Sequence, residues 1–478
     1  MAYRIMNRDE HLQNDGRPKR ILALDGGGLR GILTLGILQK IEDILRDRHG
    51  GGDGFRLCHY FDLIAGTSTG AIIAATLATG WTVEQIRQKY VSLGESVFKK
   101  SLLRQGFLRA KYDEEKLVAE LKSVYGKDTR LGGLEVLTGL LIMAKRLDTG
   151  SPWPISNNPH GKYFASRSGG TIGNGDYPLW KVVRASTAAP AYFDPETITI
   201  AKHAGYKVTK GEFVDGGVSP FNNPALQAFM YATLAGYRIR WPAGAEKLLL
   251  VSVGTGTADP DVRSSIITAK QAVSALLSLM NDCASLQETL LQWMSSSPTA
   301  REIDRELGDL HQDLIAGAPL LSYLRYNVDL QKKSVQQLDS GLTDRELIES
   351  LSAMDAPENM AVLHRLGILA AARDVKDADF AAVFDLPADL DGRSDPPISI
   401  PKIGKSYDNS PTISKEGQPI CGRRQAGPGH RRVHLPEVGR RTELQSRRLA
   451  CRQQWGCLHS RRRSIRQDLP QHRPRHFR

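Results

Sequence analysis

A serine between two glycines is the group in this sequence best placed for nucleophilic chemistry. In Gly66-Thr67-Ser68-Thr69-Gly70, a glycine stands two residues from Ser68 on each side. The apolar run 61–65 before it reads as a strand, and the run 71–78 after it as a helix. A nucleophile elbow needs this order, because the serine takes a strained backbone where strand and helix nearly touch. The helix start also brings positive partial charge to the hydroxyl. The pattern therefore predicts a nucleophilic Ser68.

A second glycine cluster lies upstream, at Asp25-Gly-Gly-Gly-Leu-Arg-Gly31, between a strand pattern at 21–24 and a helix pattern at 32–45. Its spacing satisfies the dinucleotide fingerprint, which also requires an acidic residue after a second strand about twenty residues later. Residues 47–53 are instead a polar glycine loop with no strand before it. We favour an oxyanion hole, because three successive glycines expose unobstructed N–H groups at a helix N-terminus.

The third element is an aspartate, Asp215, which follows the short strand pattern 212–214 and precedes Gly216 and Gly217. Asp-Gly is common in plain turns, so this element alone indicates only a turn. Its meaning comes from the two elements that precede it in the chain.

In that order, the segments 25–31, 66–70 and 215–217 resemble the motifs of the patatin-like phospholipase family. The segments 184–193 and 251–256 resemble two further blocks of the same family. The resemblance covers residues 20–260 and extends more loosely to about residue 385.

The resemblance implies an α/β fold, a patatin-like three-layer α/β/α domain, with a catalytic dyad instead of a triad. Ser68 matches the nucleophile, and Asp215 matches the base that takes its proton. The residues that match the oxyanion region are Gly26, Gly27, Gly28 and Arg30. A free aspartate, with a pKa of about 3.9, is a poor base for a serine hydroxyl. We therefore expect Asp215 to be partly desolvated and closely aimed at Ser68.

A Ser-His-Asp triad is the main alternative, and it needs a histidine downstream of Ser68. The candidates are His160, His203, His311 and His364. None of the four has a distinctive sequence context, and surface histidines or histidines with satisfied hydrogen bonds are the ordinary expectation.

Two other patterns are interpreted as structural. Ser186 lies among small residues on a helix pattern that Pro190 ends, where small residues permit close packing. Further along, apolar residues at helical spacing fall on one face between Leu276 and Trp293, which indicates core packing more than a ligand groove.

Four parts follow from the patterning. We expect a polar N-terminal segment at 1–19, a catalytic domain at 20–260, and a mainly helical extension at 261–385 packed on that domain. Residues 386–478 are expected to be a linker and a basic, disordered tail. Within the extension, the alternation at 324–330 reads as a late strand.

Net charge divides the chain. Residues 401–478 hold 19 Lys and Arg against 5 Asp and Glu, whereas the preceding 400 residues hold 45 against 47. From Cys421 onward the tail contains sixteen arginines, no lysine and no apolar periodicity, so it cannot build a core. It is either a basic arm for acidic lipid or nucleic acid, or an abnormal C-terminus such as a shifted reading frame. We favour the second, and expect no nucleic acid partner because aromatic residues are scarce there.

Composition also bears on location and cofactors. The start of the chain is polar, apolar runs fall short of the ~20 residues that span a bilayer, and five scattered cysteines suit a reducing compartment. We therefore expect a cytoplasmic protein at the inner face of the membrane, with no cofactor, no metal site and no calcium loop.

The function expected from these features is a lipid acyl hydrolase of the phospholipase A type that acts on membrane phospholipids through an acyl-Ser68 intermediate. One alternative is a general carboxylesterase or thioesterase. Another is a phospholipase effector of bacterial antiphage defence that a nucleotide second messenger activates, although no nucleotide pocket is identifiable in the sequence. The basic and apolar segment 98–111 is a candidate for peripheral membrane contact, with an ordinary surface helix as the alternative.

Overall fold

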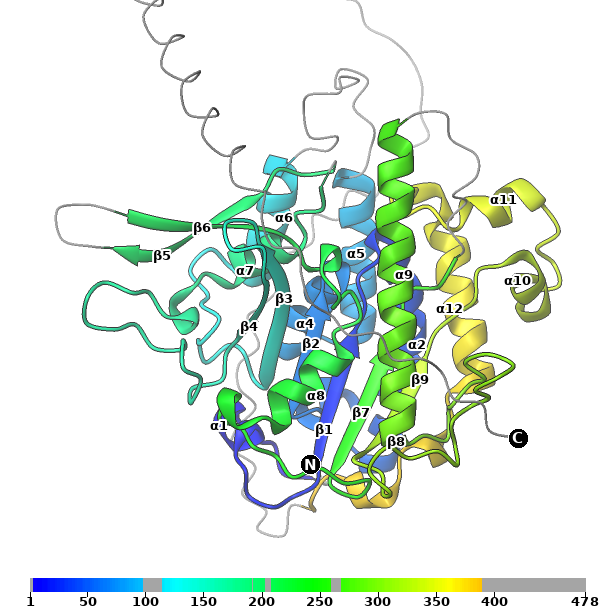
Figure 1. Ribbon diagram of the computed structural model, residues 1–478, viewed down its shortest axis with the longest axis horizontal. Coiled ribbons are helices and arrows are strands. Elements are labelled where there is room, and N and C mark those ends of the chain that lie inside the picture. Colours follow the sequence, from blue (N-terminus) through cyan, green and yellow to red (C-terminus); the bar gives the residue numbers. More distant parts are fainter. Residues whose placement is uncertain (1–2, 98–113, 191, 203–207, 259–267, 389–478) are drawn as a thin grey trace, which may run out of the picture. The chain divides into compact units, whose positions relative to one another are not determined.

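The computed structural model describes residues 3–97, 114–190, 192–202, 208–258 and 268–388, with the side chains of 268–274 outside the described part (Figure 1). The candidate membrane segment 98–111, His203 and the basic tail lie outside the described residues. No helix in the described ranges is long and apolar enough to cross a membrane.

One sheet of nine strands organises the described part of the chain. Its order is β5-β6-β3-β2-β1-β7-β9-β8, with β4 paired to β3. The central pairs from β3 to β8 are parallel, whereas β4, β5 and β6 run antiparallel to their neighbours. The strands are β1 (Lys19–Leu24), β2 (Leu63–Thr67), β3 (Gly139–Arg146), β4 (Pro152–Ser156), β5 (Glu196–Lys202), β6 (Val208–Asp215), β7 (Leu248–Val253), β8 (Ser295–Ser296) and β9 (Leu321–Tyr326).

Helices cover both faces of this sheet. The reason is visible along β1, where successive apolar side chains point to opposite faces and both sets are buried. Leu22 and Leu24 belong to one buried apolar cluster, whereas Ile21 and Ala23 belong to a second cluster on the opposite face. The first cluster includes side chains of α2, α4, α5, α6, α7 and α12, and the second includes side chains of α8 and α9. In Figure 1, α8 and α9 lie in front of the sheet, with α2, α4 and α12 behind it. The predicted three-layer α/β/α arrangement is confirmed.

The helices have these bounds: α1 (Arg8–Leu12), α2 (Gly31–His49), α3 (Leu57–Tyr60), α4 (Thr69–Ala78), α5 (Val83–Val97), α6 (Glu114–Tyr125), α7 (Leu179–Ser186), α8 (Ala225–Thr233), α9 (Thr268–Met294), α10 (Lys332–Leu338), α11 (Arg345–Ser350) and α12 (Met360–Asp374).

The predicted extension contributes to the same sheet and core. A late strand is present as β9, which pairs in parallel with β7, but it spans 321–326 and not the predicted 324–330. Farther on, α12 crosses α2 where Gly36 of α2 meets Gly367 of α12. A Cβ atom on Gly367 would lie 2.3 Å from the carbonyl oxygen of Leu33. Packing this close leaves no room for a side chain, so the extension is fitted to the layer behind the sheet. The boundary at residue 260 stays a prediction.

The predicted core packing of the stripe on α9 is wrong. Leu279 and Leu286 are 58% and 60% exposed, and Leu276 contacts a cavity described below. The helix instead turns a partly polar face inward, where Gln292 donates hydrogen bonds to the carbonyl oxygens of Arg301 and Asp309. Hydropathy cannot anticipate this face, because buried amides become acceptable only once distant carbonyl groups satisfy them.

Candidate active site

Ser68 lies at the turn between β2 and α4, in the backbone conformation that an elbow requires. Its φ of 54° and ψ of −123° put it among the few non-glycine residues of the described chain with positive φ. A Cβ atom on Gly66 would lie 2.2 Å from the carbonyl oxygen of Gly70, and one on Gly70 would lie 2.2 Å from that of Leu24. The glycines are therefore needed where the turn passes against itself and against β1. The predicted strand, turn and helix are confirmed, with the strand two residues later than expected.

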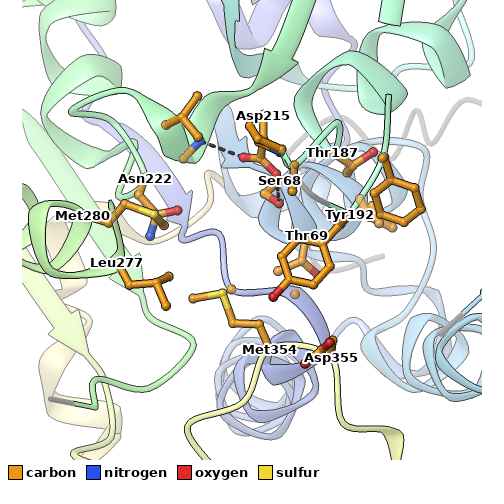
Figure 2. Close-up of a pocket in the computed structure, with 18 of the residues that line it drawn as sticks. Ser68, Thr69, Thr187, Tyr192, Asp215, Asn222, Leu277, Met280, Met354 and Asp355 are labelled. Atoms are coloured by element: carbon orange, nitrogen blue, oxygen red, sulfur yellow. Dashed lines mark hydrogen bonds between the residues drawn. The ribbon is translucent and has the colours of Figure 1, made fainter. Parts of the chain in front are cut away.

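The hydroxyl of Ser68 donates a hydrogen bond to Asp215, with 2.5 Å between Ser68 Oγ and Asp215 Oδ2 (Figure 2). Asp215 ends β6 and is 4% exposed. Its other oxygen accepts a hydrogen bond from the N–H of Gly217 at 2.7 Å. Burial raises the pKa of Asp215 to about 6, although the hydrogen bonds from Ser68 and Gly217 oppose the rise. The desolvation and close aim expected for Asp215 are both present.

The backbone N–H groups of the three successive glycines are of two kinds. One donates a hydrogen bond within the protein, and the other two have no protein acceptor in the described chain and belong to residues that line the cavity at Ser68. The N–H of Gly26 donates to the carbonyl oxygen of Asn222 at 3.1 Å, and its own carbonyl accepts from Thr255 Oγ1 at 2.9 Å. Gly27 and Gly28 line the same cavity as Ser68, and within the described chain their N–H groups donate no hydrogen bond. Two N–H groups without a protein acceptor are what an oxyanion hole requires, and the assignment of Gly27 and Gly28 to it stays a prediction.

Arg30 lies beyond these glycines, at the end of a 3-10 turn, and is not among the residues that line the cavity. It is 6% exposed, and its Nε atom has no hydrogen-bond partner in the described structure. Burial lowers the pKa of this guanidinium to about 10. Its assignment to the oxyanion region stays a prediction.

Ser186, at the end of α7, supports the elbow by hydrogen bonding and not by size alone. Its Oγ accepts the N–H of Ser68 at 2.8 Å and donates to the carbonyl oxygen of Met143 at 2.5 Å. The second serine therefore connects the turn that carries Ser68 to β3. The expected structural role is confirmed, through contacts that the sequence pattern did not indicate.

A buried ion pair anchors the glycine loop to a strand that lies 300 residues later in the sequence. Asp25 comes just before the glycines. Its two carboxylate oxygens accept hydrogen bonds from the two terminal nitrogens of Arg325, at 3.1 and 2.7 Å. Arg325 also donates to Ser252 Oγ of β7 at 2.8 Å. Sequence reasoning missed this arginine. Its position between Leu324 and Tyr326, in a strand pattern, was the available sign, because a charge inside a buried strand requires a partner.

A cavity of about 460 Å³ opens in front of Ser68 and Asp215. Most of its wall is apolar and comes from elements spread over the fold, among them α4, α5, α6, α9 and the segment 352–355. Figure 2 shows Leu277, Met280 and Met354 facing this space across from Ser68. The site can therefore hold an acyl chain against apolar side chains while a polar group meets the serine.

The alternative chemistries find less support in the geometry. Of the four candidate histidines, His160, His311 and His364 lie outside the cavity lining, and His203 is not among the described residues. For the dinucleotide alternative, α2 runs to His49 and a 3-10 turn follows at Gly52–Gly54, so no strand precedes Asp53. The described residues contain no group of three His, Cys, Asp or Glu side chains that could hold a metal ion.

Part of this chain is similar in sequence to known proteins. A family model described as patatin-like phospholipase matches residues 22–229. A cUMP-AMP-activated phospholipase of Escherichia coli is 37% identical over 221 residues, which are 45% of this chain and 59% of that protein. A cGAMP-activated phospholipase of Vibrio cholerae serotype O1 is 31% identical over 228 residues, 45% of this chain and 58% of that protein. The calcium-independent phospholipase A2-gamma of Mus musculus is 28% identical over 279 residues, 56% of this chain and 32% of that protein. The chain thus spans less than two thirds of the length of each.

The contact of Ser186 with the elbow predicts a cost to stability. In Ser186→Ala, the N–H of Ser68 and the carbonyl of Met143 both lose a buried partner. We expect the free energy of unfolding to fall by about 1–3 kcal/mol, measured by urea denaturation. Ser123→Ala is the control, because its hydroxyl bonds the carbonyl of Glu120 on the surface. Equal stability of Ser186→Ala and the unmodified protein would contradict the supporting role.

Proposed function

We propose, from the match of residues 22–229 to the patatin-like phospholipase model, that this protein is a lipid acyl hydrolase of the phospholipase A type, which cleaves fatty acyl esters of membrane phospholipids. The observation that carries the proposal is the 2.5 Å hydrogen bond between Ser68 and a buried carboxyl group, at the wall of an apolar cavity. Ser68 is the nucleophile and Asp215 is the general base.

The acylation step uses groups already in contact. Ser68 Oγ attacks the ester carbonyl carbon while its proton passes to Asp215 Oδ2. The N–H groups of Gly27 and Gly28 donate to the oxyanion that forms, and the α4 N-terminus adds positive partial charge. As the tetrahedral intermediate collapses, the lysophospholipid oxygen leaves with the proton held by Asp215. The fatty acyl group stays on Ser68.

Deacylation reverses these roles with water in place of the alcohol. Water attacks the acyl carbonyl and gives its proton to Asp215, the same N–H groups hold the oxyanion, and the acid leaves as Ser68 recovers a proton. A base with a pKa near 6 is better matched to this cycle than a free aspartate, because proton acceptance becomes less unfavourable while the group stays ionised at neutral pH.

The apolar wall of the cavity supports a long acyl chain as the substrate part next to Ser68. We further propose that the protein works in the cytoplasm, by peripheral contact with the inner face of the membrane that supplies the lipid. A general esterase or thioesterase would use the same groups on a soluble substrate. The two are separated by comparing phospholipid vesicles with a short-chain thioester.

Substitution of the paired residues tests the chemistry. Ser68→Ala and Asp215→Asn should each reduce phospholipid hydrolysis by on the order of 10⁴-fold, and the double variant should be little worse than either, because the two act as a unit. Fatty acid release measured by mass spectrometry reports the rate.

The histidines provide the control for this prediction. His203→Ala and His160→Ala should retain near-normal activity. If either change abolishes turnover in a folded protein while Asp215→Asn remains active, a histidine is the base and the proposed pairing is wrong.

The raised pKa of Asp215 predicts opposite effects of pH on activity and stability. The rate with phospholipid should rise with pH through about 6, as Asp215 ionises. Stability should fall over the same range, because the folded state binds this proton more tightly than the unfolded state, whose aspartate has a pKa of about 3.9. Asp215→Asn should therefore exceed the unmodified protein in unfolding free energy by about 3 kcal/mol at pH 8, and the gap should close towards pH 4. A gap that is independent of pH would contradict this account.

Activation by a nucleotide second messenger is the second candidate function. The observation that favours it is that two of the bacterial relatives are cyclic-nucleotide-activated phospholipases. The purified full chain should then gain at least about tenfold in hydrolysis with micromolar cUMP-AMP or cGAMP, and AMP serves as the control. Equal rates with and without each nucleotide would oppose this regulation.

A further inference from the structure

A buried tyrosine hydroxyl connects the nucleophile turn to the glycine loop. Tyr90 lies on α5 and is 3% exposed. Its hydroxyl donates a hydrogen bond to the carbonyl oxygen of Gly28, with 2.6 Å between the two oxygens. The same phenol oxygen is hydrogen bonded to Oγ1 of Thr69, the residue that follows Ser68. Because the phenol proton goes to Gly28, the Thr69 hydroxyl is the donor in the second bond. One chain of hydrogen bonds therefore runs from the turn to the loop.

Gly31, the last glycine of the loop motif, leaves the space that this chain of hydrogen bonds occupies. A Cβ atom on Gly31 would lie 2.6 Å from the hydroxyl oxygen of Tyr90 and 2.8 Å from Oγ1 of Thr69. In a close-packed interior, a side chain at this position would push the two hydroxyls apart. The absence of a side chain at Gly31 thus has a structural reason that the oxyanion interpretation of the other glycines does not supply.

The peptide unit that follows Gly28 is held on both sides. Its carbonyl oxygen accepts the hydrogen bond from Tyr90, and its N–H, which belongs to Leu29, donates to the carbonyl oxygen of Met354 at 2.8 Å. Gly28 has a φ of 58°, and a glycine has many other conformations open to it. The two hydrogen bonds restrict this freedom, so the N–H of Gly28 keeps one direction.

The hydroxyl of Tyr90 is a lasting donor. Burial raises the pKa of Tyr90 above its ordinary value, although the hydrogen bond with Thr69 opposes the rise, so the phenol stays protonated at neutral pH. Tyr90, Thr69 and Gly28 all belong to the cavity wall that contains Ser68. Figure 2 shows Thr69 beside Ser68 in this wall. The acylation and deacylation steps proposed above give the Tyr90 hydroxyl no role.

We propose that Tyr90 is a positioning residue, whose hydroxyl fixes the direction of the Gly28 N–H so that it meets the oxyanion formed when Ser68 attacks the ester. This inference rests on the proposed acyl hydrolase function and on the assignment of Gly28 to the oxyanion hole. A misdirected donor loses much of its bond to the oxyanion, because hydrogen bonds weaken steeply as their angle decreases. Binding of the intact ester does not need this bond, so its loss lowers kcat and leaves KM unchanged.

The test substitution is Tyr90→Phe, which removes the hydroxyl and keeps the ring in the cavity wall. The chain offers a matched control in Tyr125 of α6, which is 5% exposed and is not among the residues that line the cavity. Its hydroxyl donates to the carbonyl oxygen of Ile72 at 2.9 Å and is hydrogen bonded to Oγ1 of Thr76 at 3.1 Å. Tyr125→Phe therefore removes the same kinds of hydrogen bond, to a threonine of α4 and to a carbonyl, away from the glycine loop.

Two inhibitors separate oxyanion binding from occupation of the cavity. A long-chain trifluoromethyl ketone forms a tetrahedral adduct: Ser68 Oγ bonds to its carbonyl carbon, the serine proton passes to Asp215, and the carbonyl oxygen becomes an oxyanion. The matching trifluoromethyl alcohol has the same chain and forms no adduct. An inhibition constant does not depend on the fraction of protein that is folded, so a variant that folds poorly still gives a result.

In Tyr90→Phe, kcat for phospholipid in neutral mixed micelles should fall by about 10–100-fold, less than the 10²–10³-fold loss typical of removing a donor outright. KM should stay within about twofold. The ketone should bind more weakly by the same factor as kcat falls, and the alcohol should bind equally well. Tyr125→Phe should keep kcat and both inhibition constants, while its urea midpoint falls about as far as that of Tyr90→Phe, because each loses a buried hydroxyl.

Three results would overturn the role of Tyr90. They are unchanged kcat and ketone affinity in Tyr90→Phe, an equal loss of ketone and alcohol affinity, which makes Tyr90 a part of the wall and nothing more, and an equal loss of kcat in Tyr125→Phe. In each of these cases the unmodified chain still hydrolyses phospholipid, so the proposed function stands. If the unmodified full chain releases no fatty acid, or if Ser68→Ala remains active, the proposed function fails and this inference fails with it.

Discussion

The structure of the site depends on one steric constraint, the contact of the β2–α4 turn with itself and with the end of β1. Gly66 and Gly70 allow this contact, because a Cβ atom at either position would lie 2.2 Å from a backbone oxygen. The contact forces Ser68 to a φ of 54°, which is unfavourable for an L-residue and is maintained only by the surrounding packing. The same turn brings Ser68 beside the glycine loop that follows β1, so one close approach positions both the serine and the N–H groups of Gly27 and Gly28.

The second constraint is electrostatic, and it opposes stability. A carboxyl group buried to 4% exposure is a costly part of the core, yet the burial is what brings its pKa near 6. The hydrogen bonds from Ser68 and Gly217 recover part of that cost. The site therefore resembles others in which a strained and desolvated group is tolerated because the rest of the fold is well packed.

Local chemistry made some of these features predictable. The elbow follows from glycine spacing and from the apolar runs on either side, because each is a short-range property of the chain. The proximity of Asp215 to Ser68 cannot be derived from short-range patterns, because it depends on the sheet order β6-β3-β2. Only the family resemblance predicted this pair. Arg325 was missed because its role arises from a contact with Asp25, which lies 300 positions away in the sequence. The error on α9 has the same origin, because its inward amides are satisfied by the segment 301–309.

The ion pair between Asp25 and Arg325 connects the start of the sheet to a strand laid down 300 residues later. Arg325 lies well beyond residue 229, where the family match ends. During synthesis, a nascent chain that has emerged only as far as β7 carries the serine, the aspartate and the glycine loop, but the Asp25 carboxylate still lacks the two hydrogen bonds from Arg325. Ordering of the loop and docking of β9 are then expected to coincide. A fragment that ends at β7 would therefore hold Ser68, Asp215 and the glycine loop while the loop still lacks the contact with β9 that anchors it.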